Sequence, residues 1–198
     1  ARWVMAKPEK PYAKPGAMFD TSIGWRFTNP RFAEIDGGEA TFSMPQTAEK
    51  VAEIDHISRQ DADAFALRSH QRAVAAIDAG LFAPEIMPVP VSTKAGVRAV
   101  DTDEGPRRDT SAEVLAGLKS VVKPGGVVTA GNASSLNDGA AAVLVASESA
   151  VKRLGLAPRA RVVASASAGV APSVMGLGPV PATEKVLKRS GWSLGDIG

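Results

Sequence analysis

The stretch TAGNASSLNDGAAA, residues 129–142, decides the fold class of this 198-residue chain. The pattern at residues 127–130, which overlaps the start of this stretch, predicts a short strand. The polar centre of the stretch predicts a loop, and an apolar run follows at residues 140–146. Beyond it, the pattern predicts elements at the following places: a helix at 147–154, an apolar strand at 161–166, and a helix at 182–190 that Gly191 ends. Strand and helix alternate here, which is typical of a layered α/β fold.

The preceding residues predict a more irregular region. Prolines and glycines punctuate residues 1–45, and the aromatic residues there favour a loop laid over a protein surface rather than disorder. Further on, the pattern predicts a helix opened by Pro45 and running to about residue 54, a longer helix capped by Ser58 and ended by Gly80, a hairpin of strands 85–91 and 97–101, and a short helix at 111–119. Pro88 and Pro90 would place the first hairpin strand at a sheet edge.

Composition excludes several classes of function. Hydrophobic residues make up 44% of the chain, and the formal net charge of +2 implies no strong field for nucleic acid or membranes. The chain has no cysteine, so it holds no disulfide, thiolate metal site or cysteine nucleophile. No apolar run approaches the roughly 20 residues of a membrane span, and no signal-peptide core opens the chain. A cytoplasmic enzyme is therefore the default expectation, and both ends of the chain look cut.

Three segments resemble the thiolase family. They are the stretch at 129–142, the segment GVAPSVMGLGPVPA at 169–182, and the segment MPQTAEKVA at 44–52 with the helix that follows it. Their order and spacing also fit that family, so the resemblance covers essentially the whole chain. Within the family, residues 20–27 are most similar to the branch that cleaves 3-oxoadipyl-coenzyme A.

The resemblance implies an α/β fold that is part of the five-layered αβαβα thiolase architecture, with an inserted α+β loop domain. On that scheme, residues 1–5 end the first part of the N-terminal thiolase half. Residues 6–136 form the loop domain, residues 137–158 return to the N-terminal half, and residues 159–198 begin the C-terminal half. The chain is thus expected to be an internal fragment of a thiolase.

The resemblance also implies the chemistry. Thiolases move an acyl group between coenzyme A thioesters, in 3-oxoacyl-coenzyme A thiolysis or acetyl-coenzyme A condensation, through a cysteine thiolate and a second cysteine that moves a proton. The chain lacks both cysteines and the Asn-Glu-Ala-Phe, Gly-His-Pro and Cys-x-Gly motifs of the family. We therefore expect it to hold no catalytic residue, to be inactive alone, and to supply only elements that bind coenzyme A as a substrate.

Arg107 matches the arginine that thiolases use at the adenine and phosphate end of coenzyme A, and Arg108 adds charge beside it. The alternative is a solvated charge run, balanced by Asp103, Glu104 and Asp109. Val122 falls where some thiolases place an aromatic residue against adenine.

Ala130 and Ser134 match positions that touch the pantetheine arm, and a serine hydroxyl there could hydrogen-bond an amide of the arm. The alternative is an ordinary strand-to-helix loop in which Asn137 or Asp138 caps the element that follows. Ser135 stands where the family often has glycine.

Met44 and Met175 match methionines that wall the acyl and thiol end of the pocket. The alternative is that each is a core residue. The histidines, His56 and His70, have no partner at metal-ligand spacing, so both are interpreted as surface or structural residues, and no metal site is predicted.

Two other functions compete with the thiolase fragment. One is a free-standing acyl-coenzyme A-binding or protein-interaction module without catalysis, and the other is a non-functional domain whose cut faces associate. The thiolase hypothesis treats residues 129–142 and 169–182 as two walls of one acyl-thioester cleft. It also implies a homo-oligomer, a dimer or tetramer, with neither nucleic acid nor a membrane as partner.

Overall fold

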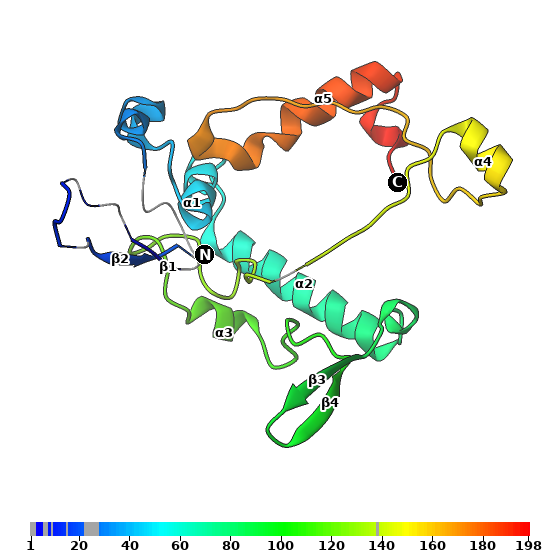
Figure 1. The fold of residues 1–198 in the computed structure, drawn as a ribbon, viewed down its shortest axis with the longest axis horizontal. Helices are drawn as coiled ribbons and strands as arrows, with labels where there is room; N and C mark the ends of the chain where they lie inside the picture. The colour runs from blue at the N-terminus through cyan, green and yellow to red at the C-terminus, as the bar shows by residue number, and fades with distance from the viewer. Residues whose placement is uncertain (1–2, 6–7, 9, 15, 22–27, 138) are drawn as a thin grey trace. The chain divides into compact units, whose positions relative to one another are not determined.

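The structure, a computed structural model, describes residues 3–5, 8, 10–14, 16–21, 28–137 and 139–198 (Figure 1). The chain divides into two compact units. We call Met44–Ser135 the helical unit, and Ala1–Ser43 together with Leu136–Gly198 the split unit. Each is described by itself. Residues 22–27 of the segment that suggested the 3-oxoadipyl branch lie outside the described residues.

Two helices dominate the helical unit and confirm the predicted pair. Helix α1 spans Met44–Ile54, and helix α2 spans Arg59–Asp78. The Ser58 hydroxyl accepts a hydrogen bond from the Asp61 amide at 3.1 Å, which satisfies one of the unpaired amides at the start of α2. Gly80, with φ of +68°, follows the C-terminal end of α2 as predicted.

The short helix α3, Ala112–Ala116, packs against α2 and supplies the core of the helical unit. Its Leu115 is 2% exposed, and Thr129 is fully buried. Ser111 caps α3, so the predicted helix is confirmed, although it is shorter than residues 111–119. The core is small, and it lies where α3 and the loop around Thr129 come together.

The predicted hairpin is also present. Strands β3, Val89–Thr93, and β4, Gly96–Val100, pair antiparallel, with Val89 opposite Val100. Strand β3 begins four residues later than predicted: a 3₁₀ turn, η3, occupies Ala83–Glu85, and residues 86–88 have no regular structure. With two strands, each is an edge, so prolines are tolerated there.

The split unit holds the remaining elements. They are strand β1 (Trp3–Met5), strand β2 (Met18–Asp20), the 3₁₀ helices η1 (Pro30–Glu34), η2 (Asp36–Gly38), η4 (Pro172–Leu177) and η5 (Leu194–Asp196), and helices α4 (Glu148–Leu154) and α5 (Pro179–Ser190). Strands β1 and β2 pair antiparallel inside the region predicted to be loop. Helix α4 confirms the predicted helix, and Ser147 caps it. Gly191 ends α5 as predicted, although α5 begins three residues earlier than expected.

Two predicted strands are wrong. Residues 161–166 have no regular structure, and Val162 is 81% exposed. Residues 127–130 form only one isolated bridge, between Ser120 and Thr129. A strand needs a partner for its backbone donors and acceptors, and an apolar pattern does not say whether that partner is present. At residues 161–168, side chains of α5 bind two of the backbone carbonyls that a neighbouring strand would otherwise bind. Arg189 donates to the Ser165 carbonyl at 2.6 Å, and Lys185 donates to the Ser167 carbonyl at 3.2 Å.

Among the described residues, no helix is both long enough and apolar enough to cross a membrane.

Candidate functional site

Four of the five predicted ligand-binding residues belong to the helical unit. Met44 is the first residue of α1, Arg107 lies in the loop between β4 and α3, and Ala130 and Ser134 lie in the loop after the Ser120–Thr129 bridge. Met175 lies in η4 of the split unit. The site can therefore be built from the helical unit, with Met175 described apart from it.

The main chain at Arg107 is anchored to α2. Its amide donates a hydrogen bond to Nδ1 of His70, at 3.1 Å, across 37 residues of sequence. An Nδ1 that accepts places the proton of the neutral imidazole on Nε2. His70 is half-buried, whereas the Arg107 side chain is exposed. His70 therefore has a structural role, as one of the two interpretations of it predicted: it anchors the backbone of a candidate ligand residue. The sequence did not predict this contact, because His70 lies in no recognisable motif.

The two neighbouring arginines differ in their partners. Arg108 forms a bidentate ion pair with Asp78, at 2.7 and 2.9 Å, near the C-terminal end of α2. The hydrogen bonds from Arg108 lower the pKa of Asp78 and raise the pKa of Arg108. A carboxyl with a lowered pKa stabilises the fold above its ordinary range, near pH 4, and loses that contribution as the pH falls.

Within the described part of the chain, the Arg107 guanidinium has no ion-pair partner. Arg108 is neutralised by Asp78, so Arg107 is the cation of this pair that remains available for an anionic ligand. The carboxylate that pairs with Arg108 is Asp78 of α2, not one of the three acidic residues of the charged loop.

The loop TAGNAS, residues 129–134, has a buried anchor and an exposed rim. Thr129 is fully buried, and its amide donates to Oδ1 of Asn132 at 2.8 Å. The Thr129 hydroxyl accepts from the Gly131 amide at 3.2 Å. Ala130 and Ser134 are both exposed. The loop thus presents one small apolar and one hydroxyl side chain from an internally bonded backbone.

Gly131 has no room for a side chain. A Cβ atom there would lie 2.5 Å from the Cδ2 atom of Leu115 and 2.5 Å from the Cδ1 atom of Leu118. The loop backbone therefore packs directly on the apolar residues at and after α3. This close approach explains why residue 131 is glycine.

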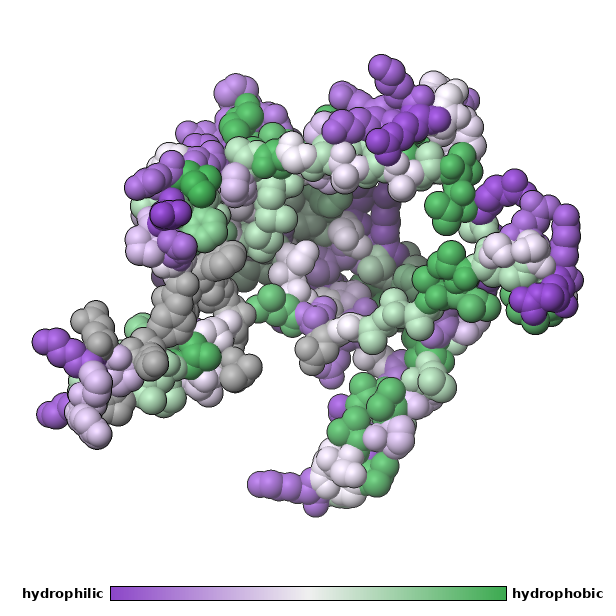
Figure 2. Space-filling model, turned by 45° about the horizontal axis from the view of Figure 1, so that its top comes forward, coloured by the Kyte–Doolittle hydropathy of each residue, from purple (hydrophilic) through white to green (hydrophobic). Residues whose placement is uncertain are grey.

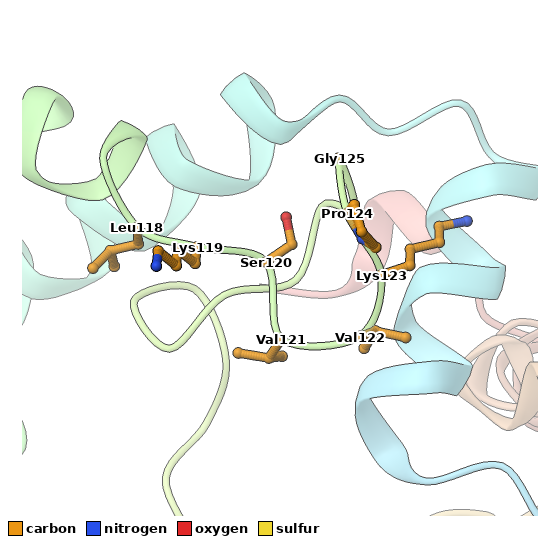
Figure 3. A pocket seen from close by; sticks show the side chains of 8 residues that line it. All are labelled: Leu118, Lys119, Ser120, Val121, Val122, Lys123, Pro124 and Gly125. Atoms are coloured by element: carbon orange, nitrogen blue, oxygen red, sulfur yellow. The ribbon is translucent and has the colours of Figure 1, made fainter.

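A pocket of about 470 Å³ adjoins the same region and is formed by one continuous stretch of chain (Figure 3). The lining residues combine apolar side chains with two lysines; they are Leu118, Lys119, Ser120, Val121, Val122, Lys123, Pro124 and Gly125. Val122 is the residue matched to an aromatic position against adenine. The Ser120 hydroxyl donates to the Gly126 carbonyl at 2.7 Å, which closes the turn. Nζ of Lys123 lies 3.7 Å from a carboxylate oxygen of Glu53, so this lysine is ion-paired within the helical unit.

The two methionines are exposed in the described part of the chain. Met44 is 57% exposed and Met175 is 48% exposed. The segment that bears Met175 is held by Asp36, whose Oδ2 atom accepts from the Ser173 amide at 2.8 Å. Exposure of this degree leaves both thioether side chains open to a ligand.

Two family models match the chain. The model described as "Thiolase, N-terminal domain" matches residues 37–149, and the model described as "Thiolase, C-terminal domain" matches residues 156–198. The quoted stretch at 129–142 lies wholly inside the first match and the segment at 169–182 inside the second.

Individual proteins agree with the family models. The chain is 52% identical over its full length to the 3-oxoadipyl-CoA/3-oxo-5,6-dehydrosuberyl-CoA thiolase of Escherichia coli, of which it covers 49%. It is 53% identical over 189 residues to the beta-ketoadipyl-CoA thiolase of Pseudomonas aeruginosa, covering 96% of this chain and 46% of that protein. The crystal structure of human mitochondrial 3-ketoacyl-CoA thiolase matches all of the chain with a TM-score of 0.80 and 38% identity, over 48% of its own length. The chain spans about half the length of the curated relatives it matches.

Proposed function

The chain belongs to the thiolase family, and on that premise we propose that it supplies coenzyme A-binding elements of a thiolase-type acyltransferase. The resemblance inferred from the sequence is thereby confirmed, as is an α/β thiolase fold for the chain. The proposed reaction transfers an acyl group between coenzyme A thioesters. The two relatives described above are named for 3-oxoadipyl-CoA or beta-ketoadipyl-CoA, so we propose a dicarboxylic 3-oxoacyl thioester as the substrate.

The observation that supports this proposal most directly is the state of Arg107. Its backbone is tied to His70 and its guanidinium is unpaired among the described residues, while its neighbour Arg108 is occupied by Asp78. An exposed guanidinium on an anchored backbone, without a carboxylate partner among the described residues, is suited to bind phosphate. We assign Arg107 to the phosphates of coenzyme A.

The other assignments follow the resemblance to thiolases and are compatible with the exposure of each residue. The pocket around Val122 is proposed to take the adenine, with Lys119 and Lys123 beside it. Ala130 and Ser134, on the exposed rim of the TAGNAS loop, are proposed to face the pantetheine arm. Met44 and Met175 are proposed to wall the acyl and thiol end of the site.

The transfer step needs a thiolate that this chain does not contain. The sequence has no cysteine, and a thiolase forms its acyl-enzyme on one. We therefore propose that the nucleophile, the second cysteine and the oxyanion-binding groups come from polypeptide other than these residues. The 198 residues alone are expected to bind the substrate without turning it over. No covalently bound cofactor is part of this proposal.

The predicted domain scheme belongs to the same proposal: residues 6–136 as the loop domain, and 137–158 and 159–198 as parts of the two thiolase halves. So do a homo-oligomeric enzyme and a cytoplasmic location. The reading frame on either side of the segment separates this proposal from a free-standing binding module. Continuation into a cysteine motif upstream and a Gly-His-Pro motif downstream supports the enzyme, and a start and a stop codon at the two ends support the module.

Titration calorimetry with coenzyme A tests the binding site. We expect the 198-residue chain to bind coenzyme A, and Arg107→Ala to weaken binding by about tenfold or more, the worth of one charge-assisted hydrogen bond to phosphate.

Arg108→Ala is the matched control. It removes the neighbouring guanidinium, which Asp78 already occupies, so its effect on coenzyme A affinity should stay within about threefold. Absence of binding by the unaltered chain, or equal losses in the two variants, contradicts the assignment of Arg107.

A further inference from the structure

We propose that Asp63, held by Arg59, is a positioning residue for the pantetheine side of the site and acts through Asn132 on the TAGNAS loop. This inference rests on the proposed function for its ligand, and on contacts within the helical unit for its mechanism. None of the three residues is expected to touch coenzyme A.

Asn132 uses its whole side-chain amide inside the unit. Oδ1 accepts from the Thr129 amide at 2.8 Å, while Nδ2 donates to the Val127 carbonyl and to Oδ1 of Asp63, both at 2.9 Å. This pattern also settles which atom of the amide is nitrogen, because both partners of Nδ2 are acceptors. The side chain therefore bridges the backbone on the N-terminal side of the loop to helix α2.

Asp63 is the centre of the bridge. It is a carboxylate only 7% exposed, in the second turn of α2, and each of its oxygens has a partner. Oδ1 accepts from Asn132, and Oδ2 accepts from Nε of Arg59 at 2.7 Å. A buried carboxylate is costly unless it is paired and hydrogen-bonded, and this one is both.

Arg59 extends the bridge to α3. Its Nη2 atom donates to the carbonyls of Leu115 and Leu118, at 2.6 and 3.1 Å, at and just after the end of α3. The Leu115 carbonyl also accepts from the Leu118 amide at 3.1 Å, so Arg59 binds a turn that is already closed by a backbone hydrogen bond. A continuous hydrogen-bonded path thus runs from the end of α3 through Arg59, Asp63 and Asn132 to Thr129. Such a network restrains orientation more than any one of its bonds would alone.

The path ends at the segment that presents the proposed ligand contacts. Ala130 follows the bonded Thr129 directly, and Ser134 lies two residues after Asn132. Both are exposed, so neither is positioned by burial in the core. The placement of the two residues therefore depends on the backbone bonds that Asn132 orders, and through them on Asp63.

Calorimetric titration of two ligands tests this role. Asn132→Ala is expected to weaken coenzyme A binding by about tenfold, the worth of one to two lost hydrogen bonds, and to leave binding of adenosine 3′,5′-bisphosphate within about twofold. The bisphosphate reports on the nucleotide end of the site, which Arg107 serves. Asn137→Ala is the control, because Asn137 is exposed in the same stretch. Equal losses for both ligands in Asn132→Ala would mean a general loss of structure and would overturn the proposal.

A double substitution tests whether Asp63 acts through Asn132. Asn132→Asp sets a carboxylate against Asp63 and is expected to weaken coenzyme A binding by more than tenfold. Adding Asp63→Asn restores a donor between the two side chains, so affinity should recover by about fivefold or more in the double variant. Effects that simply add contradict the coupling.

Hydrogen exchange separates this inference from the proposed function. If the unaltered chain fails to bind coenzyme A, the proposed function is contradicted. The hydrogen-bonded network can still be tested by measuring exchange rates of the backbone amides. Asn132→Ala should speed exchange at the Thr129 amide while the amides of α1 keep their protection. Unchanged exchange at Thr129 would overturn the network whatever the ligand result.

Discussion

At the scale of single residues, two glycines and one buried glutamate set how closely the chain packs around the candidate site. A Cβ at Gly126 would lie 2.5 Å from Oε1 of Glu49, and the same oxygen accepts from the Val128 amide at 2.7 Å. Gly131 packs as closely on two leucines. These contacts join α1 and the region of α3 to residues 126–131. The packing therefore needs glycine at positions 126 and 131 as much as it needs the Glu49 side chain.

Gly131→Ala is expected to destabilise the chain by about 1–3 kcal/mol, because the added methyl overlaps Leu115 and Leu118 in the core. Denaturant unfolding followed by circular dichroism measures the loss.

Gly139→Ala is the control, since a Cβ there meets nothing within 4 Å, and it should change the unfolding free energy by less than about 0.5 kcal/mol. Equal effects of the two variants would show that the close approach at Gly131 is unimportant.

At the scale of elements, the helices and the β3–β4 hairpin are specified locally, and strands that need a distant partner are not. Ser58, Ser111 and Ser147 each accept a hydrogen bond from the amide three residues on, at 3.1–3.2 Å, and each opens a helix that the sequence predicted. A cap and the helix it starts lie within a few residues of each other, so they are visible in the sequence. The wrong strands at 127–130 and 161–166 needed partners that the pattern does not describe.

Ser58→Ala should cost about 1 kcal/mol of unfolding free energy by removing the cap of α2. Ser69→Ala, on an exposed position inside the same helix, should be neutral or slightly stabilising, since alanine is the better helix former. Thermal and denaturant unfolding of both variants measure the difference. A Ser58→Ala variant as stable as Ser69→Ala would contradict the capping role.

At the scale of the molecule, the chain exposes apolar segments that its own described residues do not cover. Val143, Leu144 and Val145 are 86%, 81% and 80% exposed, in an extended run that precedes α4 (Figure 1). Figure 2 shows hydrophobic residues, in green, open on the drawn face. Consecutive apolar residues this exposed favour association between molecules.

We expect the 198-residue chain to associate as its concentration rises, and Val143→Lys with Val145→Lys to reduce that association. Alternate residues of an extended chain face the same side, so the pair places two charges on one face. Sedimentation velocity at several concentrations measures the effect.

Met87→Lys serves as the comparison, because Met87 is 81% exposed outside that run. A double variant that associates as strongly as Met87→Lys would show that the run at 143–145 is not the contact.

The sequence by itself determined the family, the helices and the hairpin, and from it we proposed the candidate ligand residues. Helix caps, turn glycines and the motif at 129–142 all act over short distances along the chain, so their signals are complete in the sequence. Only the tertiary structure decided which arginine is available, because Asp78 lies 30 residues from Arg108, and how the loop is held, because Asp63 lies 69 residues from Asn132. Contacts of that separation depend on packing of α2 against α3 and the loop, and no local pattern of residues specifies them.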